Sequence, residues 1–286
     1  MNIAIVGSDG YIAGYLRKNL LSRGHMILNI DKTVGGDTQY LDLKNADRFH
    51  YSVLDSIDYV VFTSAISGPD KCAEEYDLCW KINVDGTNYF IKEAIDRRCR
   101  VLFFSSDAVY GDIPGYIYTE DSDLKGMTPY GRMKRAVEEE FRDNPYFKVI
   151  RLSYVMSASD RFLSYCLGCM RNDEMADIFH PFYRNVVSVT DVVQVVSWFA
   201  DHYDDFPYQA LNVVGSELVS RVRMADELNR IFDGKLKYTI SRNVADFFKN
   251  RPATTQVQSL YAEQYKILAN ESFTEKIQRE MEGITI

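Results

Sequence analysis

The sequence has few cysteines, no excess of basic residues and no long apolar run. Only five of its 286 residues are cysteine, an odd number that is too small for a disulfide framework, so we expect reduced thiols. The 33 Lys and Arg residues are outnumbered by 41 Asp and Glu residues, which gives a net charge of −8. A chain without a basic field binds nucleic acid or acidic membranes poorly, so we expect neither partner.

The sequence also lacks a segment that would direct the chain into a membrane. No apolar run approaches the roughly 18 to 20 residues that span a bilayer, and residues 1–6 lack the charged start and long apolar stretch of a signal peptide. We therefore expect a cytoplasmic protein. Cys166 and Cys169 have the spacing of half a zinc site, but no second pair lies nearby and the four histidines are scattered, so we expect no metal.

What the sequence does contain is an alternation of strand and helix patterns over residues 1–155. Short apolar segments that predict strands lie at 3–6, 26–30, around Tyr40, and at 59–63, 101–105 and 147–152. Helical patterns at 11–23 and 69–98 separate them, which predicts a parallel sheet covered on both faces. The alternation fades after residue 155 and predicts a smaller second lobe over 156–286, with segments around 186–214 returning to the first domain.

The first predicted strand runs into a glycine-rich turn and the start of a helix. Gly7 and Gly10 let backbone amides approach a pyrophosphate, and the helix N-terminus supplies the positive end of its dipole. Asp31 ends the second strand at roughly the 20-residue spacing of an acid that accepts the adenosine ribose hydroxyls. Its charge favours NAD over NADP, whereas Lys32 beside it would attract the extra phosphate of NADP.

A serine, a tyrosine and a lysine form the candidate catalytic set. The strand at 101–105 leads into Ser106, while Tyr130 and Lys134 lie four apart on one face of a helix predicted at 130–141. An ammonium beside a phenol lowers the pKa of the tyrosine, which lets it exchange a proton with a substrate oxygen that the serine also binds. This trio fits the interconversion of carbonyl and alcohol, with a nicotinamide carrying the hydride.

Five segments of the chain follow one another in an order and spacing shared with a known family. They are Gly7-x-x-Gly10-x-x-Ala13, Asn83-Val-Asp-Gly-Thr-Asn88, Ser105-Ser106-Asp-Ala-Val-Tyr-Gly111, Tyr130-x-x-x-Lys134 and Val189-Thr-Asp191-Val. On these segments the whole chain resembles the extended short-chain dehydrogenase/reductases of the NAD-dependent epimerase/dehydratase family. Ala13 departs from the glycine usual in the family, and we expect Gly14 to relieve the extra methyl.

The resemblance implies an α/β fold and a role for individual residues. The fold would be a Rossmann-type doubly wound parallel sheet, with the NAD(P) site and the catalytic residues in 1–155, and a small C-terminal α/β substrate-binding lobe. Ser106 would hold the substrate oxygen, Tyr130 would be the acid/base, and Lys134 would orient the nicotinamide ribose. The cofactor would contact Gly7, Gly10, Tyr11, Ile12, Asp31, Asp42, Leu43, Ser64, Ala65, Asn83, Tyr130 and Lys134.

The resemblance also implies the partners of the chain. The cofactor would be NAD, with NADP as the alternative, and Asn83 would hold the backbone of the active site. The substrate would be a nucleoside-diphosphate sugar that contacts Ser106, Asp107, Tyr154, Arg184 and Arg251, the two arginines binding its diphosphate. In many relatives the helices that match 83–98 and 130–141 form a dimer interface, which implies a homodimer.

Several reactions compete within this family. The dehydratases carry two acids after the active serine or threonine, whereas Asp107 is followed by Ala108, which argues against dehydration. Residues 105–107 resemble the dTDP-4-dehydrorhamnose reductases, and Tyr154 stands where many epimerases have asparagine, so we expect reduction of the 4-keto group of a nucleoside-diphosphate 6-deoxyhexose. The segment from Arg184 is closer to the epimerase form, which keeps an NAD-dependent epimerase open. A non-catalytic NAD-binding regulatory subunit is the third interpretation.

Overall fold

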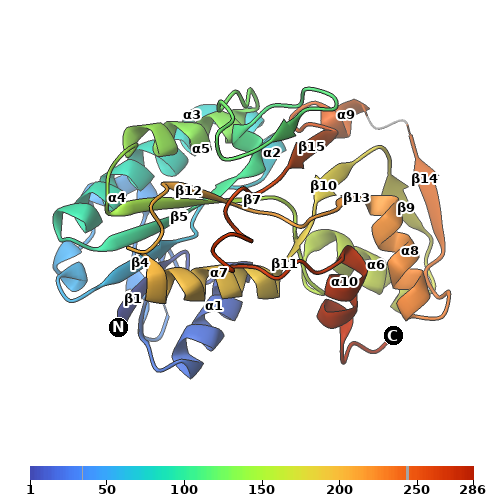
Figure 1. Cartoon of the computed structure of the whole chain (residues 1–286), viewed down its shortest axis with the longest axis horizontal. Coiled ribbons are helices and arrows are strands. Elements are labelled where there is room, and N and C mark those ends of the chain that lie inside the picture. Colours follow the sequence, from blue (N-terminus) through green and yellow to red (C-terminus); the bar gives the residue numbers. More distant parts are fainter. Residues whose placement is uncertain (34, 243–244) are drawn as a thin grey trace.

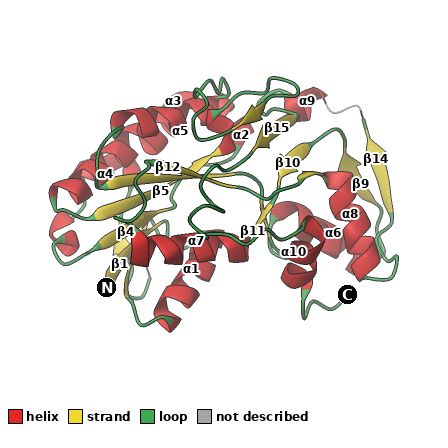
Figure 2. Ribbon diagram, in the orientation of Figure 1, coloured by secondary structure: helices red, strands yellow, loops and turns green. Residues whose placement is uncertain are grey.

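A sheet of seven parallel strands forms the centre of the computed structural model, which describes residues 1–33, 35–242 and 245–286 (Figures 1 and 2). The strand order is β12-β7-β5-β4-β1-β2-β3. These strands are β1 (Asn2–Val6), β2 (Met26–Asp31), β3 (Gln39–Tyr40), β4 (Tyr59–Phe62), β5 (Arg100–Ser106), β7 (Phe147–Leu152) and β12 (Ala210–Val213). Every residue of β4 is buried, as expected for a parallel sheet covered on both faces, and the predicted fold is confirmed.

Helices cover both faces of this sheet. On one face, α1 (Tyr11–Ser22) and α7 (Val189–His202) bury residues such as Leu16 and Phe199 against the strands. On the other face, α4 (Thr87–Asp96) and α5 (Pro129–Glu140) form a second apolar core, which also includes Leu54 of the short helix η2 (Tyr51–Leu54). Figure 1 shows these two layers below and above the sheet. None of the helices in the described ranges is long and apolar enough to cross a membrane.

The helical pattern predicted over 69–98 is divided into four helical segments. They are α2 (Pro69–Glu74), α3 (Tyr76–Trp80), the π-helix η3 (Lys81–Gly86) and α4. The first break falls at Glu75, whose φ of −114° and ψ of 48° are not helical. Gly86 is pressed onto η1 (Leu43–Arg48), since a Cβ on it would lie 1.9 Å from the carbonyl oxygen of Leu43. This close approach fixes η3 over the end of the sheet.

A second, smaller lobe has its own sheets and its own core. A four-stranded sheet contains β6 (Ile117–Tyr118), β10 (Tyr183–Asn185), β13 (Leu218–Ser220) and β15 (Thr254–Val257), and two strand pairs join β8 (Val155–Met156) to β11 (Val187–Ser188) and β9 (Ala176–Phe179) to β14 (Tyr238–Ser241). The helices are α6 (Arg161–Asn172), α8 (Arg221–Ile231), α9 (Ala245–Phe248) and α10 (Phe273–Met281). Leu163, Leu228 and Ile277 pack together in this lobe, which lies on the right of Figure 1.

The chain crosses between the lobes more than once. α7 and β12 pack in the first domain although they follow β8 to β10 in the sequence. β6 lies early in the chain and pairs with β15 of the second lobe, whereas Tyr261 and Ile267 join the core beneath α7. Segments from both parts of the sequence therefore line the space between the lobes, where a cavity of about 130 Å³ lies between Ala108, Thr128 and Arg251.

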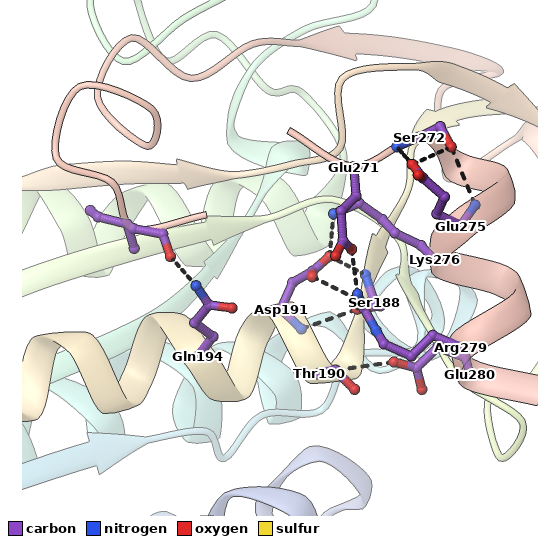
Figure 3. A network of polar contacts seen from close by, with 11 residues as sticks. Ser188, Thr190, Asp191, Gln194, Glu271, Ser272, Glu275, Lys276, Arg279 and Glu280 are labelled. Carbon is purple, nitrogen blue, oxygen red and sulfur yellow. Dashed lines mark hydrogen bonds and ion pairs between the residues drawn. The ribbon is translucent and has the colours of Figure 1, made fainter. Parts of the chain in front are cut away.

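A buried polar network ties α7 to α10 and so joins the two lobes (Figure 3). Ser188 caps α7, because its Oγ accepts from the Asp191 N–H at 3.0 Å while its own N–H donates to Asp191 Oδ2. From α10, Lys276 Nζ donates to Asp191 Oδ2 at 2.5 Å and Arg279 Nη2 donates to Oδ1 at 3.0 Å. The side chains of Asp191 and Lys276 are almost fully buried. The family-like segment at 189–191 thus has a structural role in this chain.

Candidate active site

The glycine-rich turn after β1 packs tightly against the segment after β4. Gly7 has a φ of +87°, and a Cβ on it would lie 2.8 Å from Thr63 Oγ1 and 2.9 Å from the Cα of Ser64. Only glycine therefore fits this position. Gly10 caps α1 without a side-chain hydrogen bond, which leaves the amides of the first helical turn available to an anion. This bare helix start fits the pyrophosphate of a dinucleotide.

Ala13, where the family usually has glycine, is accommodated by the core itself. Its methyl group is buried in the cluster beneath α1 and α7. Gly14 is exposed, and a Cβ on it would meet nothing within 4 Å. The expectation that Gly14 relieves the extra methyl is therefore wrong, since Gly14 lies on the solvent side of the helix.

Asp31 is fixed at the edge of the sheet beside the glycine-rich turn. Its Oδ2 accepts from the Asp9 N–H at 3.0 Å and its Oδ1 from the Lys32 N–H at 2.7 Å. The carboxylate therefore caps the turn, and two oxygens with several lone pairs keep acceptor capacity for hydroxyl groups. A fixed negative charge here suits an unphosphorylated ribose and repels a ribose phosphate, so these residues fit NAD better than NADP.

Replacing Asp31 with Asn is expected to weaken NADH binding about tenfold and to narrow the preference for NADH over NADPH, because the charged acceptor is lost. Titration of the protein fluorescence with each dinucleotide measures both affinities. Asp47→Asn, on the exposed side of η1, is the control and leaves both unchanged. A wild-type chain that binds NADPH as tightly as NADH would contradict this role of Asp31.

The other residues predicted to contact the cofactor lie around the glycine-rich turn and at the start of η1. Asp42 caps η1, because its Oδ1 accepts from the Lys44 N–H at 3.0 Å, and Leu43 is buried under η3. The Tyr11 hydroxyl at the start of α1 donates to Ser157 Oγ in the second lobe. Ile12, Ser64 and Ala65 are partly buried around the same turn. Their contacts with a cofactor stay predictions.

The predicted catalytic residues come from two elements that touch at the carboxyl edge of the sheet. Ser106 ends β5 and leads into η4 (Asp107–Val109), and Thr128 caps α5. α5 lies directly on η4, since a Cβ on Gly131 would be only 2.1 Å from the carbonyl oxygen of Ala108. This packing places Tyr130, in the first turn of α5, beside the end of β5.

Lys134 is buried one turn after Tyr130 and is held by the sheet. Its Nζ donates to the Phe104 carbonyl at 2.6 Å and lies 4.4 Å from the ring centroid of Phe103, but 5.8 Å from that of Tyr130. Burial lowers the pKa of Lys134 to about 7. Burial also raises the pKa of Tyr130, and the nearby Cys72 and Asp107 add to this rise. The expected lowering of the tyrosine pKa is therefore not seen, because the lysine faces a backbone carbonyl.

Asn83 holds the backbone that follows β4. Its Oδ1 accepts from the Ile66 N–H at 2.8 Å, and its Nδ2 donates to the Ile66 carbonyl at 2.9 Å. Both edges of the amide thus bind Ile66, and Nδ2 also donates to Met133 Sδ of α5 at 3.6 Å. The π-helical turn η3 presents Asn83 for this contact, which keeps the loop between β4 and α2 next to α5.

Asp107 and Arg184 form a buried pair between the lobes. Asp107 Oδ2 accepts from Ser153 Oγ at 2.8 Å and lies 3.6 Å from Arg184 Nε, while Ser106 Oγ donates to Asp107 Oδ1 at 3.2 Å. The terminal nitrogens of Arg184 donate to backbone carbonyls, including that of Pro252 at 2.7 Å. Most of the N–H donors of Arg184 therefore already bind groups of the protein. Few are left for its predicted contact with a diphosphate.

Arg251 and Tyr154 lie on either side of the same region. Arg251 Nη2 donates to Asp70 Oδ2 at 2.5 Å, and Asn250 Nδ2 donates to the other oxygen at 3.1 Å. These hydrogen bonds from Asn250 and Arg251 lower the pKa of Asp70, which begins α2 in the first domain. The Tyr154 hydroxyl donates to Asp160 Oδ1, so its ring is fixed just after β7.

A buried network beneath the site was not predicted from the sequence. Arg151 Nη2 donates to Glu138 Oε2 at 2.7 Å, and Ser105 Oγ donates to Glu138 Oε1. Arg151 Nη1 also donates to the Tyr110 hydroxyl at 2.8 Å, which in turn donates to Asn212 Oδ1 at 2.7 Å. Glu138 lies one turn after Lys134 and raises its pKa, in opposition to burial. The network therefore supports the catalytic helix from below.

A doubly wound parallel sheet that carries serine, tyrosine and lysine at its carboxyl edge defines the class of extended short-chain dehydrogenase/reductases. The family model of the NAD dependent epimerase/dehydratase family matches residues 3–214, and the chain belongs to this family. Curated relatives include UDP-glucose 4-epimerase 1 of Oryza sativa subsp. japonica, 27% identical over 53% of this chain and 50% of the relative. The chain spans about half the length of the curated relatives it matches.

Solved structures share the fold over nearly the whole chain. MoeE5 in complex with UDP-glucose and NAD has a TM-score of 0.83 and 19% identity, with 99% of this chain and 98% of that chain covered. A dTDP-4-dehydrorhamnose reductase from Clostridium acetobutylicum has a TM-score of 0.82 and 19% identity, with 98% of both chains covered. At this identity the similarity establishes the fold, and the reaction has to be argued from the site.

Proposed function

We propose that this chain is an NAD-dependent oxidoreductase of nucleoside-diphosphate sugars, which reduces the 4-keto group of a 6-deoxyhexose. The observation that carries the proposal is the convergence of Ser106, Tyr130 and Lys134 where β5 meets α5. Burial raises the pKa of Tyr130. Its phenol can donate a proton to a carbonyl oxygen, which is the acid catalysis that reduction requires.

The residues of the chain divide the proton chemistry between them. When bound at the glycine-rich turn, NADH supplies the hydride. Tyr130 donates its phenolic proton to the carbonyl oxygen, and the Ser106 hydroxyl donates a hydrogen bond to the same oxygen. Lys134, which is held by the Phe104 carbonyl one turn after Tyr130, would orient the nicotinamide ribose. Asn83 keeps the backbone at Ile66 against this group, so the geometry is set before the substrate arrives.

Tyr154 supports a deoxysugar as the substrate. Its hydroxyl is held by Asp160, which fixes the ring at the end of β7, the strand beside the one that carries Ser106. An immobile aromatic ring offers an apolar surface that suits a methyl group better than a hydroxymethyl group.

An NAD-dependent epimerase is the second candidate, and contacts between the lobes favour it. Tyr11 in the cofactor turn bonds Ser157 of the second lobe, and Asp70 after β4 bonds Asn250 and Arg251. Links on two sides of the site would enclose a bound cofactor. An epimerase benefits from such retention, because its cofactor is restored in every cycle. UDP-sugar epimerases also appear among the relatives of the chain.

The proposed homodimer would use α4 and α5, which lie beside each other on one face of the sheet (Figure 1). Tyr89 on α4 is 43% exposed, so this face presents an aromatic ring to a second copy. Light scattering of the purified chain measures its mass in solution, and a monomer would contradict this part of the proposal.

The experiment that tests the function offers the purified protein a panel of UDP- and dTDP-linked 4-keto-6-deoxy sugars with NADH or NADPH. Loss of dinucleotide absorbance that matches the formation of one new sugar alcohol is the expected result. Inversion of a saturated UDP-sugar without net loss of dinucleotide would assign the epimerase instead. Binding of NAD with no turnover of any sugar would leave the non-catalytic subunit as the explanation and overturn both enzymatic proposals.

A further inference from the structure

Three arginines of the second lobe alternate with two phenylalanine rings. Arg184 and Arg221 lie on Phe182, with guanidinium carbons 4.4 and 4.7 Å from its ring centroid. Arg221 and Arg251 lie on Phe247, at 5.0 and 4.2 Å. Arg221 is therefore the middle member of this arginine array, and neither the sequence motifs nor the family resemblance pointed to it.

The three arginines differ in what they already bind. Arg184 has Asp107 near its Nε and backbone carbonyls at its terminal nitrogens. Arg251 pairs with Asp70. Arg221 makes no hydrogen bond and no ion pair to any residue in the described ranges, and its Nε is buried there without a partner. Among the residues that the structure describes, its donors therefore have no partner, in contrast to those of its two neighbours.

Three aromatic rings hold the Arg221 side chain in place. Besides Phe182 and Phe247, the ring centroid of Phe162 at the start of α6 lies 4.8 Å from its guanidinium carbon. Burial lowers the pKa of Arg221, Tyr154 and Asp160 raise it, and the neighbouring charge of Arg251 lowers it. The rings attract the guanidinium, and a bound anion would offset its partial burial and the repulsion from Arg251.

The position of Arg221 indicates which part of a substrate it meets. Asp107 lies near Tyr130, Arg184 pairs with Asp107, and both Arg184 and Arg221 contact the ring of Phe182. Arg221 is therefore linked by successive contacts to the carboxylate beside the catalytic tyrosine. In a nucleoside-diphosphate sugar, the diphosphate follows the sugar outward from the reacting carbon.

We propose that Arg221 is a diphosphate-binding residue of the substrate site, placed by Phe182 and Phe247 between Arg184 and Arg251. The inference rests on the proposed function, since it requires a nucleoside-diphosphate substrate. The planar guanidinium offers parallel N–H donors that match two phosphate oxygens. Arg184 then acts as a positioning residue that holds β10 to the segment before β15, while Arg251 adds a second charge from the other side.

The test measures binding of UDP, dTDP and UMP to the NAD-loaded protein by calorimetry. Arg221→Met, which keeps the unbranched stem among the rings, is expected to weaken binding of the preferred diphosphate about 10- to 100-fold. The loss with UMP is expected to be smaller, and NAD affinity is expected to stay unchanged. Arg223→Met is the matched control with unchanged affinity, because Arg223 lies two residues along the same helix, is half exposed and pairs with Glu227.

A second variant tests whether a loss of affinity could come from misfolding of the protein. Arg221→Lys keeps the charge but loses the planar fork, so it is expected to bind the diphosphate with an intermediate affinity and to unfold at the wild-type temperature. Wild-type diphosphate affinity in both Arg221 variants would overturn this inference and leave the proposed function intact. A wild-type protein that binds NAD but neither UDP nor dTDP would overturn the proposed function, and the inference with it.

Discussion

Tyr130→Phe is expected to lower the turnover of the sugar substrate by at least 1,000-fold, on the order of what general acid catalysis contributes together with loss of the proton donor. The phenylalanine fills the same space at the start of α5, so the fold and the glycine-rich turn are left as they are. NADH affinity is therefore expected to stay within about twofold. Turnover is followed by dinucleotide absorbance with the sugar identified by the panel, and affinity by fluorescence titration.

The control for this variant is Tyr146→Phe. Tyr146 lies in the turn before β7, is 36% exposed, and its hydroxyl makes no hydrogen bond to the residues that the structure describes. Its loss is expected to change neither turnover nor affinity. A Tyr130→Phe protein that retains a third or more of the wild-type turnover would contradict the acid/base role, whatever its affinity for NADH.

Glu138→Leu is expected to lower the free energy of unfolding by about 3 to 5 kcal/mol, because it leaves the buried guanidinium of Arg151 without its carboxylate. The two side chains are only 5% and 8% exposed, and Arg151 Nε and Nη2 both donate to Glu138 Oε2, at 3.0 and 2.7 Å. Ser105 loses its acceptor as well. Urea denaturation of the two proteins measures the difference.

Two further variants test whether the loss of stability comes from the unpaired charge of Arg151 or from a leucine substitution in α5 as such. Glu139→Leu replaces the next residue of α5, whose exposed carboxylate pairs with Arg135. It is expected to lower the free energy of unfolding by less than about 1 kcal/mol. The double variant Glu138→Leu/Arg151→Met is expected to recover much of the loss, since no buried charge is then left unpaired. Equal costs for Glu138→Leu and Glu139→Leu would refute the argument.

The parts of the molecule that were predicted correctly are those whose signal is local in the sequence. The strands ending at Val6 and Ser106 are short apolar runs between turns, and Tyr130 and Lys134 share a face because the helix has a fixed period. The close approach of Gly86 to the backbone of Leu43 was not predicted, because it is a tertiary contact. No pattern of spacing reports such a contact.

Contacts between buried polar residues of different elements also could not be predicted from the sequence. Glu138 and Arg151 lie on different elements and meet only when α5 packs on the sheet. Arg184 was assigned to the diphosphate as a guanidinium, but its terminal donors are used by backbone carbonyls. Arg221 has no motif around it and stands out only because Phe182 and Phe247 surround it in space. Which arginine is free is a property of the fold.

Two of the polar links between the lobes, at Asp191 and at Asp70, differ in how they respond to salt. The contacts of Asp191 with Lys276 and Arg279 lie mostly away from solvent, whereas the side chain of Asp70 in its pair with Arg251 is 51% exposed. Ionic strength screens an exposed pair much more than a buried one. Raising the salt concentration is therefore expected to weaken the Asp70–Arg251 pair more than the contacts of Asp191 with α10.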